Sequence, residues 1–316
     1  MKQIVLGSLV AVACAGCVAP MMRSTLSAPP TPVQSAELWE APTDIATRNL
    51  FDGPWGKELA PDPTATFSFV SAKSVGVSPG YAVTDAKGIE WSVKQGREAK
   101  VEVVMSRVLS AVGYHQPPVY YLPEWTLAKW TLAEGSSKKT EPEGRFRPKH
   151  SVLKDEGEWS WHENPFIGTQ PYNGLRVLMM ILNESDLKDS NNTLYSVKEP
   201  GGASDAPRRW FVVRDIGTAL GETGRLNPAR GDAGLFEENR FITGVKNGFV
   251  EFEYRGRHQE LADHISVDDV KWMCNLLMQL SAEQWNDAFR AGGYDAATSE
   301  RFIARIKAKM AQGLAL

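Results

Sequence analysis

Midway along the chain the sequence reads Ser185-Asp186-Leu187-Lys188-Asp189-Ser190-Asn191-Asn192, and a second motif follows at Val212-Val213-Arg214-Asp215-Ile216-Gly217. The first motif places a lysine two residues and an asparagine five residues after an aspartate. The second is an apolar strand pattern that ends in Asp-x-Gly. Magnesium accepts carboxylate and amide oxygens as ligands, and phosphoryl transfer needs such ions together with a base for the acceptor hydroxyl. The two motifs therefore predict a phosphoryl-transfer site, with Asp186 orienting or deprotonating the acceptor, Lys188 neutralising the transferred group, and Asn191 and Asp215 holding magnesium.

An ordinary polar turn is the alternative interpretation of residues 185–192. Asp, Ser and Asn gather in turns because their side chains bond to nearby backbone groups, and the first motif alone does not decide between turn and site. The second motif favours a site. Residues 209–214 are typical of a buried strand, and the acidic residue at its end is followed by Gly217, where the chain must turn sharply.

Three strand patterns lie upstream, at residues 66–73, 81–85 and 89–94. Gly76, Ser78 and Gly80 fall in the turn between the first two strands, and the third strand carries Lys94 near its end. A strand lysine is commonly a solvated edge residue. However, a glycine turn between strands followed by a terminal lysine is also the order of a hairpin that covers a nucleotide and contacts its phosphates.

The next segment, residues 97–113, repeats apolar residues at helical spacing and ends at a glycine. Glu98 and Glu102 are one turn apart and share a face of this predicted helix. Either glutamate can pair with Lys94 and direct its ammonium toward phosphate. We favour Glu102 because it lies within the helix, whereas Glu98 favours the positive N-terminal end. Two solvated glutamates are the alternative.

Over residues 67–217 the chain resembles the protein-kinase-like superfamily. The resemblance implies an α+β fold with two lobes, a small antiparallel sheet lobe and a mostly helical lobe, with ATP and Mg²⁺ bound between them. It also implies a role for each matching residue: cofactor binding for Lys94, Glu102, Gly76, Ser78 and Gly80, catalysis for Asp186 and Lys188, and metal binding for Asn191 and Asp215.

The resemblance is to atypical members, such as the HipA-like, spore-coat CotH-like and secretory-pathway kinases. Glu184-Ser185 stands where His-Arg precedes the catalytic Asp in ordinary kinases, and Asp-Ile-Gly replaces Asp-Phe-Gly. Because the superfamily includes pseudokinases and AMP transferases, two readings stay open. One is a transferase with an unknown hydroxyl-bearing acceptor, and the other is a catalytically silent module that binds an envelope partner.

The N-terminus is typical of an exported bacterial lipoprotein. A short basic start is followed by an apolar run at residues 4–13, which is too short to span a bilayer, and then by Cys14-Ala15-Gly16-Cys17. We expect lipid attachment at Cys17, with Cys14 as the second choice and a plain secretory signal as the alternative. This predicts a lipid-anchored protein of the bacterial cell envelope that faces the periplasm or the cell exterior.

Four segments are predicted from end to end. Residues 1–17 form the signal peptide and lipobox, and residues 18–36, rich in Pro, Ser, Ala and Thr, form a flexible tether. Residues 37–122 form the β-rich lobe, and residues 123–316 form a hinge region and the helical lobe. The helical lobe is expected to contain helices at 173–182, 267–280, 282–291 and 297–312, and a hairpin that turns at Lys246-Asn247-Gly248.

Composition limits the classes of partner that the chain can be expected to bind. The 316 residues carry a formal net charge of -3, without the excess of basic residues typical of nucleic-acid-binding proteins, so nucleic acid is not expected as a partner. The five histidines show no paired metal-ligand spacing, so no zinc site is predicted, and His258 is expected in a surface loop. No Ser, His and acid group stands out as a hydrolase triad.

Overall fold

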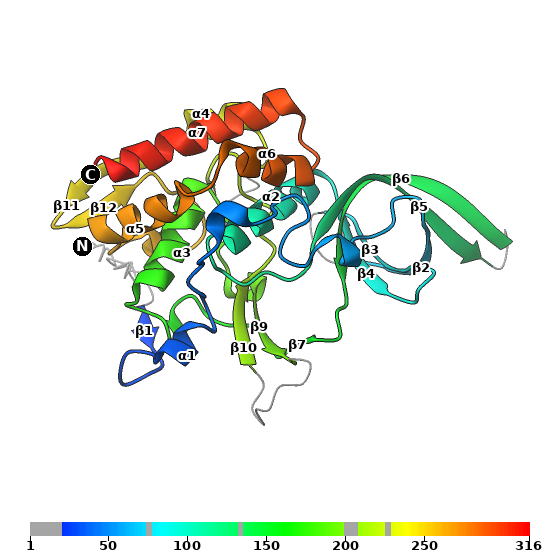
Figure 1. Ribbon diagram of the computed structural model, residues 1–316, viewed down its shortest axis with the longest axis horizontal. Coiled ribbons are helices and arrows are strands. Elements are labelled where there is room, and N and C mark those ends of the chain that lie inside the picture. Colours follow the sequence, from blue (N-terminus) through cyan, green and yellow to red (C-terminus); the bar gives the residue numbers. More distant parts are fainter. Residues whose placement is uncertain (1–20, 74–77, 132–134, 199–207, 225–228) are drawn as a thin grey trace, which may run out of the picture.

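The computed structural model describes residues 21–73, 78–131, 135–198, 208–224 and 229–316 (Figure 1). Two separate hydrophobic cores give it two lobes. The smaller core lies within a β-barrel, and the larger core is formed by the helices and the loops between them. The predicted α+β fold with two lobes is confirmed. Among the described helices, none has both the length and the apolar character needed to cross a lipid bilayer.

The smaller lobe is a closed barrel rather than an open sheet. Its strands, in the order β2-β3-β4-β6-β5, are Thr66–Ala72, Gly80–Thr84, Glu90–Gln95, Gly135–Pro148 and Tyr120–Thr131. Neighbouring strands are antiparallel except β2 and β5, which pair in parallel and close the barrel. Phe146 fills the interior, with the rings of Trp91 and Trp125 meeting it edge to face at 6.1 and 5.4 Å. The three strands predicted upstream of the helix are confirmed.

The predicted lobe boundary at residue 122 is wrong. β5 and β6 continue the barrel as far as Pro148, because β6 pairs with β4 along five residues and with β5 along eleven. The sequence does not reveal that β6 pairs with β4 and β5, since β6 is rich in charged residues. Its Arg145 faces Lys94 of β4 but comes 51 positions later in the chain. The hinge toward the larger lobe therefore follows Pro148.

Helix α2, Arg97–Ala111, joins the two lobes. It begins two residues after β4 ends, and its start agrees with the predicted helix at 97–113. Val104, Met105 and Val108 belong to the larger core, although the predicted division placed this helix in the β-rich lobe. Its polar side faces the barrel, where Glu102 contacts arginines of β6. α2 thus shares its two faces between the lobes.

The larger lobe contains the predicted helices. They are α3 at Gln170–Ile181, α5 at Val267–Leu277, α6 at Ala282–Ala291 and α7 at Ala296–Leu314, with the short α4 at Ala233–Glu238. Figure 1 shows α3, α5 and α7 at the end of the molecule opposite the barrel. Ser266 and Ser281 each close a capping box at the start of α5 and α6, which fixes where these helices begin. Strands β11, Ile242–Lys246, and β12, Phe249–Phe252, form the predicted hairpin around Asn247-Gly248, both of which have positive φ.

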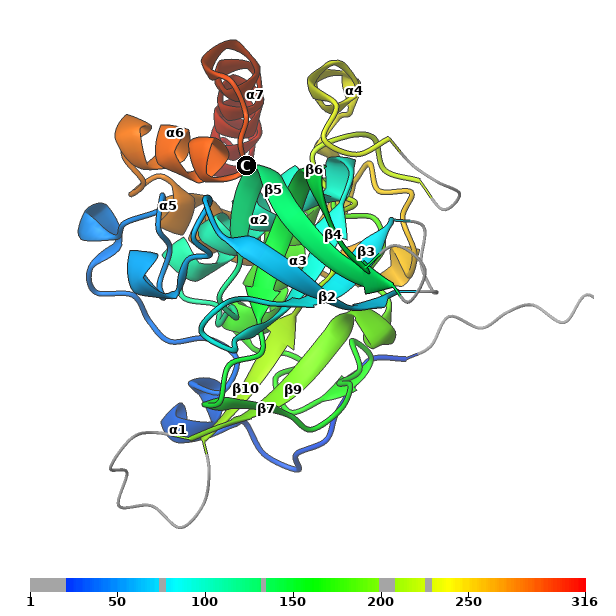
Figure 2. The same ribbon diagram turned by 90° about the vertical axis from the view of Figure 1, so that its right-hand side faces the viewer.

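A three-stranded sheet, ordered β10-β9-β7, lies beneath the barrel in Figure 2. Its strands are Arg208–Val213, Asn192–Val197 and Leu153–Asp155. The short helix η3, Asp189–Asn191, leads directly into β9, and Asn192 pairs with Val213 at the end of β10. The chain therefore enters β9 from the Asp186 motif beside the point where it leaves β10 toward Asp215.

The predicted flexible tether over residues 18–36 is wrong for its described part. Strand β1, Arg23–Ser24, pairs in parallel with β8, Glu163–Asn164, and Thr31 caps helix α1, Pro32–Ser35. The Arg23 N–H donates to the carbonyl of His162 at 2.8 Å. Backbone pairing of this kind depends little on composition, so a Pro- and Ser-rich segment does not reveal it. The predicted signal peptide, Cys14 and Cys17 lie outside the described residues.

Candidate active site

The Asp186 cluster consists of Asp186, Lys188, Asn191 and Arg257. Lys188 Nζ lies 2.7 Å from Asp186 Oδ2, and Arg257 Nε lies 2.8 Å from Oδ1. The Asn191 amide donates to the Asp186 carbonyl at 2.7 Å and to Oδ2 at 3.2 Å. The structure thus brings together the three residues predicted from the first motif. Arg257, to which the sequence assigned no role, is an additional partner that reaches Asp186 from 71 residues downstream.

The Lys94 cluster consists of Lys94, Glu98, Glu102 and Asp215, together with Arg145 and Arg147. The Lys94 ammonium lies 2.7 Å from Glu98 Oε2 and 3.5 Å from Glu102 Oε2, and it also contacts Asp215. Asp215 has a φ of 54°, in the left-handed region that residues with a Cβ rarely adopt. Such a conformation persists only where the surroundings hold it, and it directs the Asp215 carboxylate to Lys94.

Glu98, rather than Glu102, is the nearer helix partner of Lys94. Because α2 begins directly after β4, Glu98 in its first turn faces back to the lysine four residues earlier. The preferred Lys94–Glu102 pair is present, but it is the longer of the two. The sequence allowed either glutamate to pair with Lys94 and favoured Glu102, so the shorter contact of Glu98 corrects that preference.

Glu102 is held mainly by two arginines of β6. Its Oε1 lies 3.1 Å from Arg145 Nε and also contacts Arg147, and the Glu102 side chain is only 2% exposed. Burial raises the pKa of Glu102, but Arg145, Lys94 and Arg147 outweigh burial and hold the pKa well below its usual range. Glu102 is therefore a buried, ionised carboxylate that connects α2 to the barrel.

Sequence reasoning missed most of the cations in this region. Arg145 and Arg147 alternate with Phe146 on β6, and Arg145 lies opposite Lys94 in the sheet register, so both arginines point to the lysine's side. Arg230 contacts Glu98, and the Lys73 ammonium donates to Ser92. In the described region the cationic side chains outnumber the carboxylates, which suits a polyanion such as a nucleotide phosphate chain. The alternation of arginines around a buried aromatic was the signal available in the sequence.

Two glycines allow close approach of backbone in the Lys94 cluster. A Cβ on Gly217 would lie 2.7 Å from Glu98 Cβ, so the Asp-Ile-Gly motif packs directly on the first turn of α2. A Cβ on Gly80 would lie 2.9 Å from the carbonyl oxygen of Val93, and Gly80 faces Lys94 across the β3–β4 pair. Ser78 is half-buried just before β3, whereas Gly76 lies outside the described residues.

Two connections join the clusters. The Arg214 N–H donates to the Asn191 carbonyl at 2.9 Å, which places Asn191 beside the residue that precedes Asp215. Glu184 forms the second connection, since its Oε1 accepts from the Asp186 N–H at 2.9 Å and from the hydroxyl of Thr218. The predicted metal ligands therefore belong to neighbouring segments of one site.

Glu184 stands two residues before Asp186, in the Glu184-Ser185 pair that replaces the His-Arg of ordinary kinases. Burial raises the pKa of Glu184 to about 7; hydrogen bonds from Thr218 and Asp186 partly offset this, and the charges of Asp186 and Asp215 add to it. Within the described structure, its buried Oε2 has no hydrogen-bond partner. Sequence reasoning noted the departure from the kinase motif but assigned Glu184 no role.

The donor groups fit a hard cation and a nucleotide. Asp215 offers a carboxylate that is 49% exposed, and Asn191 offers an amide, both of which are oxygen donors of the kind that Mg²⁺ prefers. Lys94 and its arginine neighbours provide positive charge beside them. The arrangement is suited to holding phosphates and one or two divalent ions between the barrel and the larger lobe.

Comparison with known proteins gives only distant likenesses. No family model and no curated protein sequence matches the chain. The crystal structure of a Helicobacter pylori proinflammatory kinase, CtkA, aligns with 9% identity and a TM-score of 0.42 over 80% of this chain and 98% of that chain. The Golgi casein kinase with Mn/ADP bound aligns with 9% identity and a TM-score of 0.40, covering 81% of this chain and 74% of that chain. Another structure of the Golgi casein kinase aligns with 9% identity and a TM-score of 0.38, covering 86% of this chain and 73% of that chain.

Proposed function

We propose that this chain is an ATP-dependent phosphoryl or nucleotidyl transferase of kinase-like fold that acts on a hydroxyl-bearing acceptor. One observation carries the proposal: Lys94 of the barrel contacts Asp215, which is 121 residues further along the chain. Asp215 follows β10, and β10 pairs with β9, the strand that begins directly after Asn191. A lysine and a carboxylate from distant segments thus meet, and the Asn191 backbone carbonyl accepts from the N–H of the residue before Asp215. Phosphoryl transfer depends on positioning and charge, which such a group of residues supplies.

Each residue has a distinct task in this proposal. Lys94, oriented by Glu98 and Glu102, neutralises the non-transferred phosphates. Asp215 and Asn191 hold Mg²⁺, which when bound neutralises the charge of the phosphate oxygens. Asp186 orients the acceptor and takes the proton of its hydroxyl as the acceptor oxygen bonds to phosphorus. Lys188 neutralises charge on the transferred group, and both Lys188 and Arg257 contact the Asp186 carboxylate and fix it in place.

A catalytically silent envelope-binding module is the second candidate. The observation that favours it is that Glu184-Ser185 stands before Asp186, where ordinary kinases have His-Arg. Under either candidate we propose attachment to the bacterial envelope through lipid on Cys17, with Cys14 as the second choice. The support is the leader sequence with its apolar run and paired cysteines.

Thermal unfolding with nucleotide tests the proposal. In a chain that begins at Val18, Mg-ATP should raise the melting temperature, because a ligand that binds only the folded state stabilises it. Asp215→Asn should abolish this shift. Asp186→Asn should keep the shift but lower phosphoryl or nucleotidyl transfer by about 10²–10⁴-fold, the usual contribution of a positioned base.

Asp268→Asn is the matched control, since Asp268 is an exposed aspartate of α5 outside both clusters. It should leave the shift and the transfer rate unchanged. Absence of any shift with ATP, GTP or other nucleotides would favour the binding module. Full activity in Asp186→Asn would show that the base is assigned to the wrong residue.

A further inference from the structure

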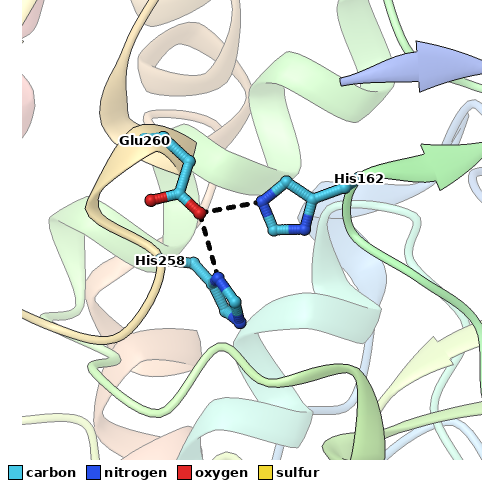
Figure 3. Close-up of side chains that lie close together, drawn as sticks. All are labelled: His162, His258 and Glu260. Atoms are coloured by element: carbon cyan, nitrogen blue, oxygen red, sulfur yellow. Dashed lines mark hydrogen bonds and ion pairs between the residues drawn. The ribbon is translucent and has the colours of Figure 1, made fainter. Parts of the chain in front are cut away.

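His162, His258 and Glu260 form a compact cluster outside the candidate active site (Figure 3). Glu260 Oε1 lies 2.9 Å from His162 Nε2 and 3.0 Å from His258 Nδ1. His162 directly precedes β8, whereas His258 and Glu260 stand at the start of helix η4, Gln259–Ala262. The histidine spacing predicted no zinc site, and that prediction does not take account of folding, which brings together two histidines 96 residues apart.

The geometry is close to that of a bound ion. The three ligand atoms all lie within 4.8 Å of one another. In a tetrahedral zinc site with bonds of about 2.0–2.1 Å, neighbouring ligand atoms are about 3.4 Å apart. The two separations from Glu260 Oε1 are slightly shorter than this, so a small outward rotation of the rings makes room for the ion. The rings meet at 66° with centroids 4.8 Å apart, so both can direct a nitrogen to one point.

The surroundings favour a cation that keeps one open position. The side chains of His162 and Glu260 are 11% and 20% exposed, while that of His258 is 37% exposed. Ions and water can therefore enter from the His258 side. Two imidazoles and one carboxylate are a ligand set that suits Zn²⁺ and related first-row ions.

The cluster holds a turn that needs support. His258 has a φ of 53°, in the left-handed region, and its neighbour Arg257 donates its N–H to the Ser185 carbonyl at 2.8 Å. Residues with a Cβ adopt that conformation only where other contacts hold them. A metal ion bound by His258 and Glu260 would anchor this turn to His162, on the segment that pairs with β1.

We propose that His162, His258 and Glu260 form a binding site for one divalent transition-metal ion of the Zn²⁺ type, which ties the turn at residues 257–260 to the segment before β8. None of these three ligands is among the residues assigned to nucleotide or magnesium, although the turn includes Arg257, which contacts Asp186. The site differs from the magnesium ligands Asn191 and Asp215 in offering nitrogen donors, which hard cations avoid.

Titration of the full chain with zinc alone tests this proposal. After treatment with EDTA and desalting, calorimetry with ZnCl₂ should show one tight site, and Co²⁺ should give the visible bands of a tetrahedral complex. Zinc should also raise the melting temperature. His258→Gln and Glu260→Gln should each weaken zinc binding by more than about 100-fold, which exceeds the effect of losing an outer hydrogen-bond partner.

His264→Gln is the matched control, because His264 is an exposed histidine with positive φ four residues after Glu260. It should bind zinc as the unaltered chain does. Equal binding in the His258, Glu260 and His264 variants, or no binding by the unaltered chain, would leave an ordinary hydrogen-bonded cluster and overturn the proposal. Should one variant fail to fold by circular dichroism, the other variant and the Co²⁺ spectrum of the unaltered chain still decide.

Discussion

The Asp186 cluster and the Lys94 cluster are built in different ways. Asp186, Lys188 and Asn191 fall within six residues of one loop, and the side chains of Asp186 and Lys188 are 22% and 36% exposed. The Lys94 cluster draws on β4, α2, β6 and the loop after β10, and the side chains of Glu102 and Arg145 are 2% and 3% exposed. Asp186, Lys188 and Asn191 are therefore local and partly exposed, and only Arg257 joins them from afar. Glu102 and Arg145 are brought together over a long range and are buried, although Asp215 of the same cluster is 49% exposed. The comparison teaches that ionised residues of one site can have different roles: some are placed to bind a ligand, and others connect two parts of the fold.

The position of the buried cluster explains this second task. Glu102 stands on α2, whose apolar face belongs to the larger core, while Arg145 and Arg147 stand on the barrel. The ion pairs therefore cross from one lobe to the other. Removing one member of a buried pair leaves an uncompensated charge in a poorly solvated place, which costs far more than the loss of an exposed pair.

The largest effect is expected from Glu102→Gln. The substitution keeps the shape of the side chain but leaves Arg145 and Arg147 without their buried counter-charge. We expect the free energy of unfolding to fall by about 3–5 kcal/mol. Urea unfolding followed by tryptophan fluorescence measures it.

Glu124→Gln on β5 is the control for this prediction, since Glu124 is an exposed glutamate of the same barrel. Its unfolding free energy should change by no more than about 0.5 kcal/mol. Equal midpoints and slopes for the two variants would mean that the buried cluster does not hold the lobes together.

The contrast between the clusters also explains what sequence could predict. The Asp186 cluster follows from local spacing, and so do β10 and Asp215 at its end. The Lys94 cluster depends on pairing between β4 and β6, which local pattern does not encode, so Arg145 and Arg147 were missed. The choice between Glu98 and Glu102 depended on where α2 begins relative to β4, a matter of one helical turn.

Other parts of the fold also separate into elements that the sequence could predict and contacts that it could not. Helices with capping residues and the hairpin at Asn247-Gly248 were predictable, because their signals lie within a few residues. The pairing of β1 with β8 and the meeting of His162 with His258 were not, since both join segments far apart in the chain. Glu184 shows an intermediate case: its place before Asp186 was visible, but its burial and its contact with Thr218 were not.

An intermediate effect is expected from Glu184, which lies between the two clusters. Because the pKa of Glu184 is raised to about 7 in the folded chain, the folded state holds a proton that the unfolded state loses near pH 4.5. The Glu184 contribution to stability should therefore fall by about 3 kcal/mol as pH rises from about 4.5 to 7. Burial lowers the pKa of His115 to about 4, so His115 makes an opposite contribution over much of the same range. Glu184→Gln should remove the Glu184 contribution alone, so the difference in stability between the two chains should change with pH.

Melting temperatures of both chains across this pH range measure the effect. Glu158→Gln is the control, since Glu158 is an exposed glutamate, and it should keep the pH dependence of the unaltered chain. A Glu184→Gln curve that runs parallel to the unaltered curve would place the proton on another group.

The smallest effect is expected from Lys188→Met. Lys188 is partly exposed, and Asp186 keeps Arg257 at 2.8 Å and the Asn191 amide at 3.2 Å when the lysine is removed. Solvent and salt also screen the pair, so the free energy of unfolding should fall by less than about 1 kcal/mol, and by less still in high salt. Urea unfolding at low and high NaCl measures both. A loss as large as that of Glu102→Gln, unchanged by salt, would show that the two clusters act as one buried network and would remove the distinction between them.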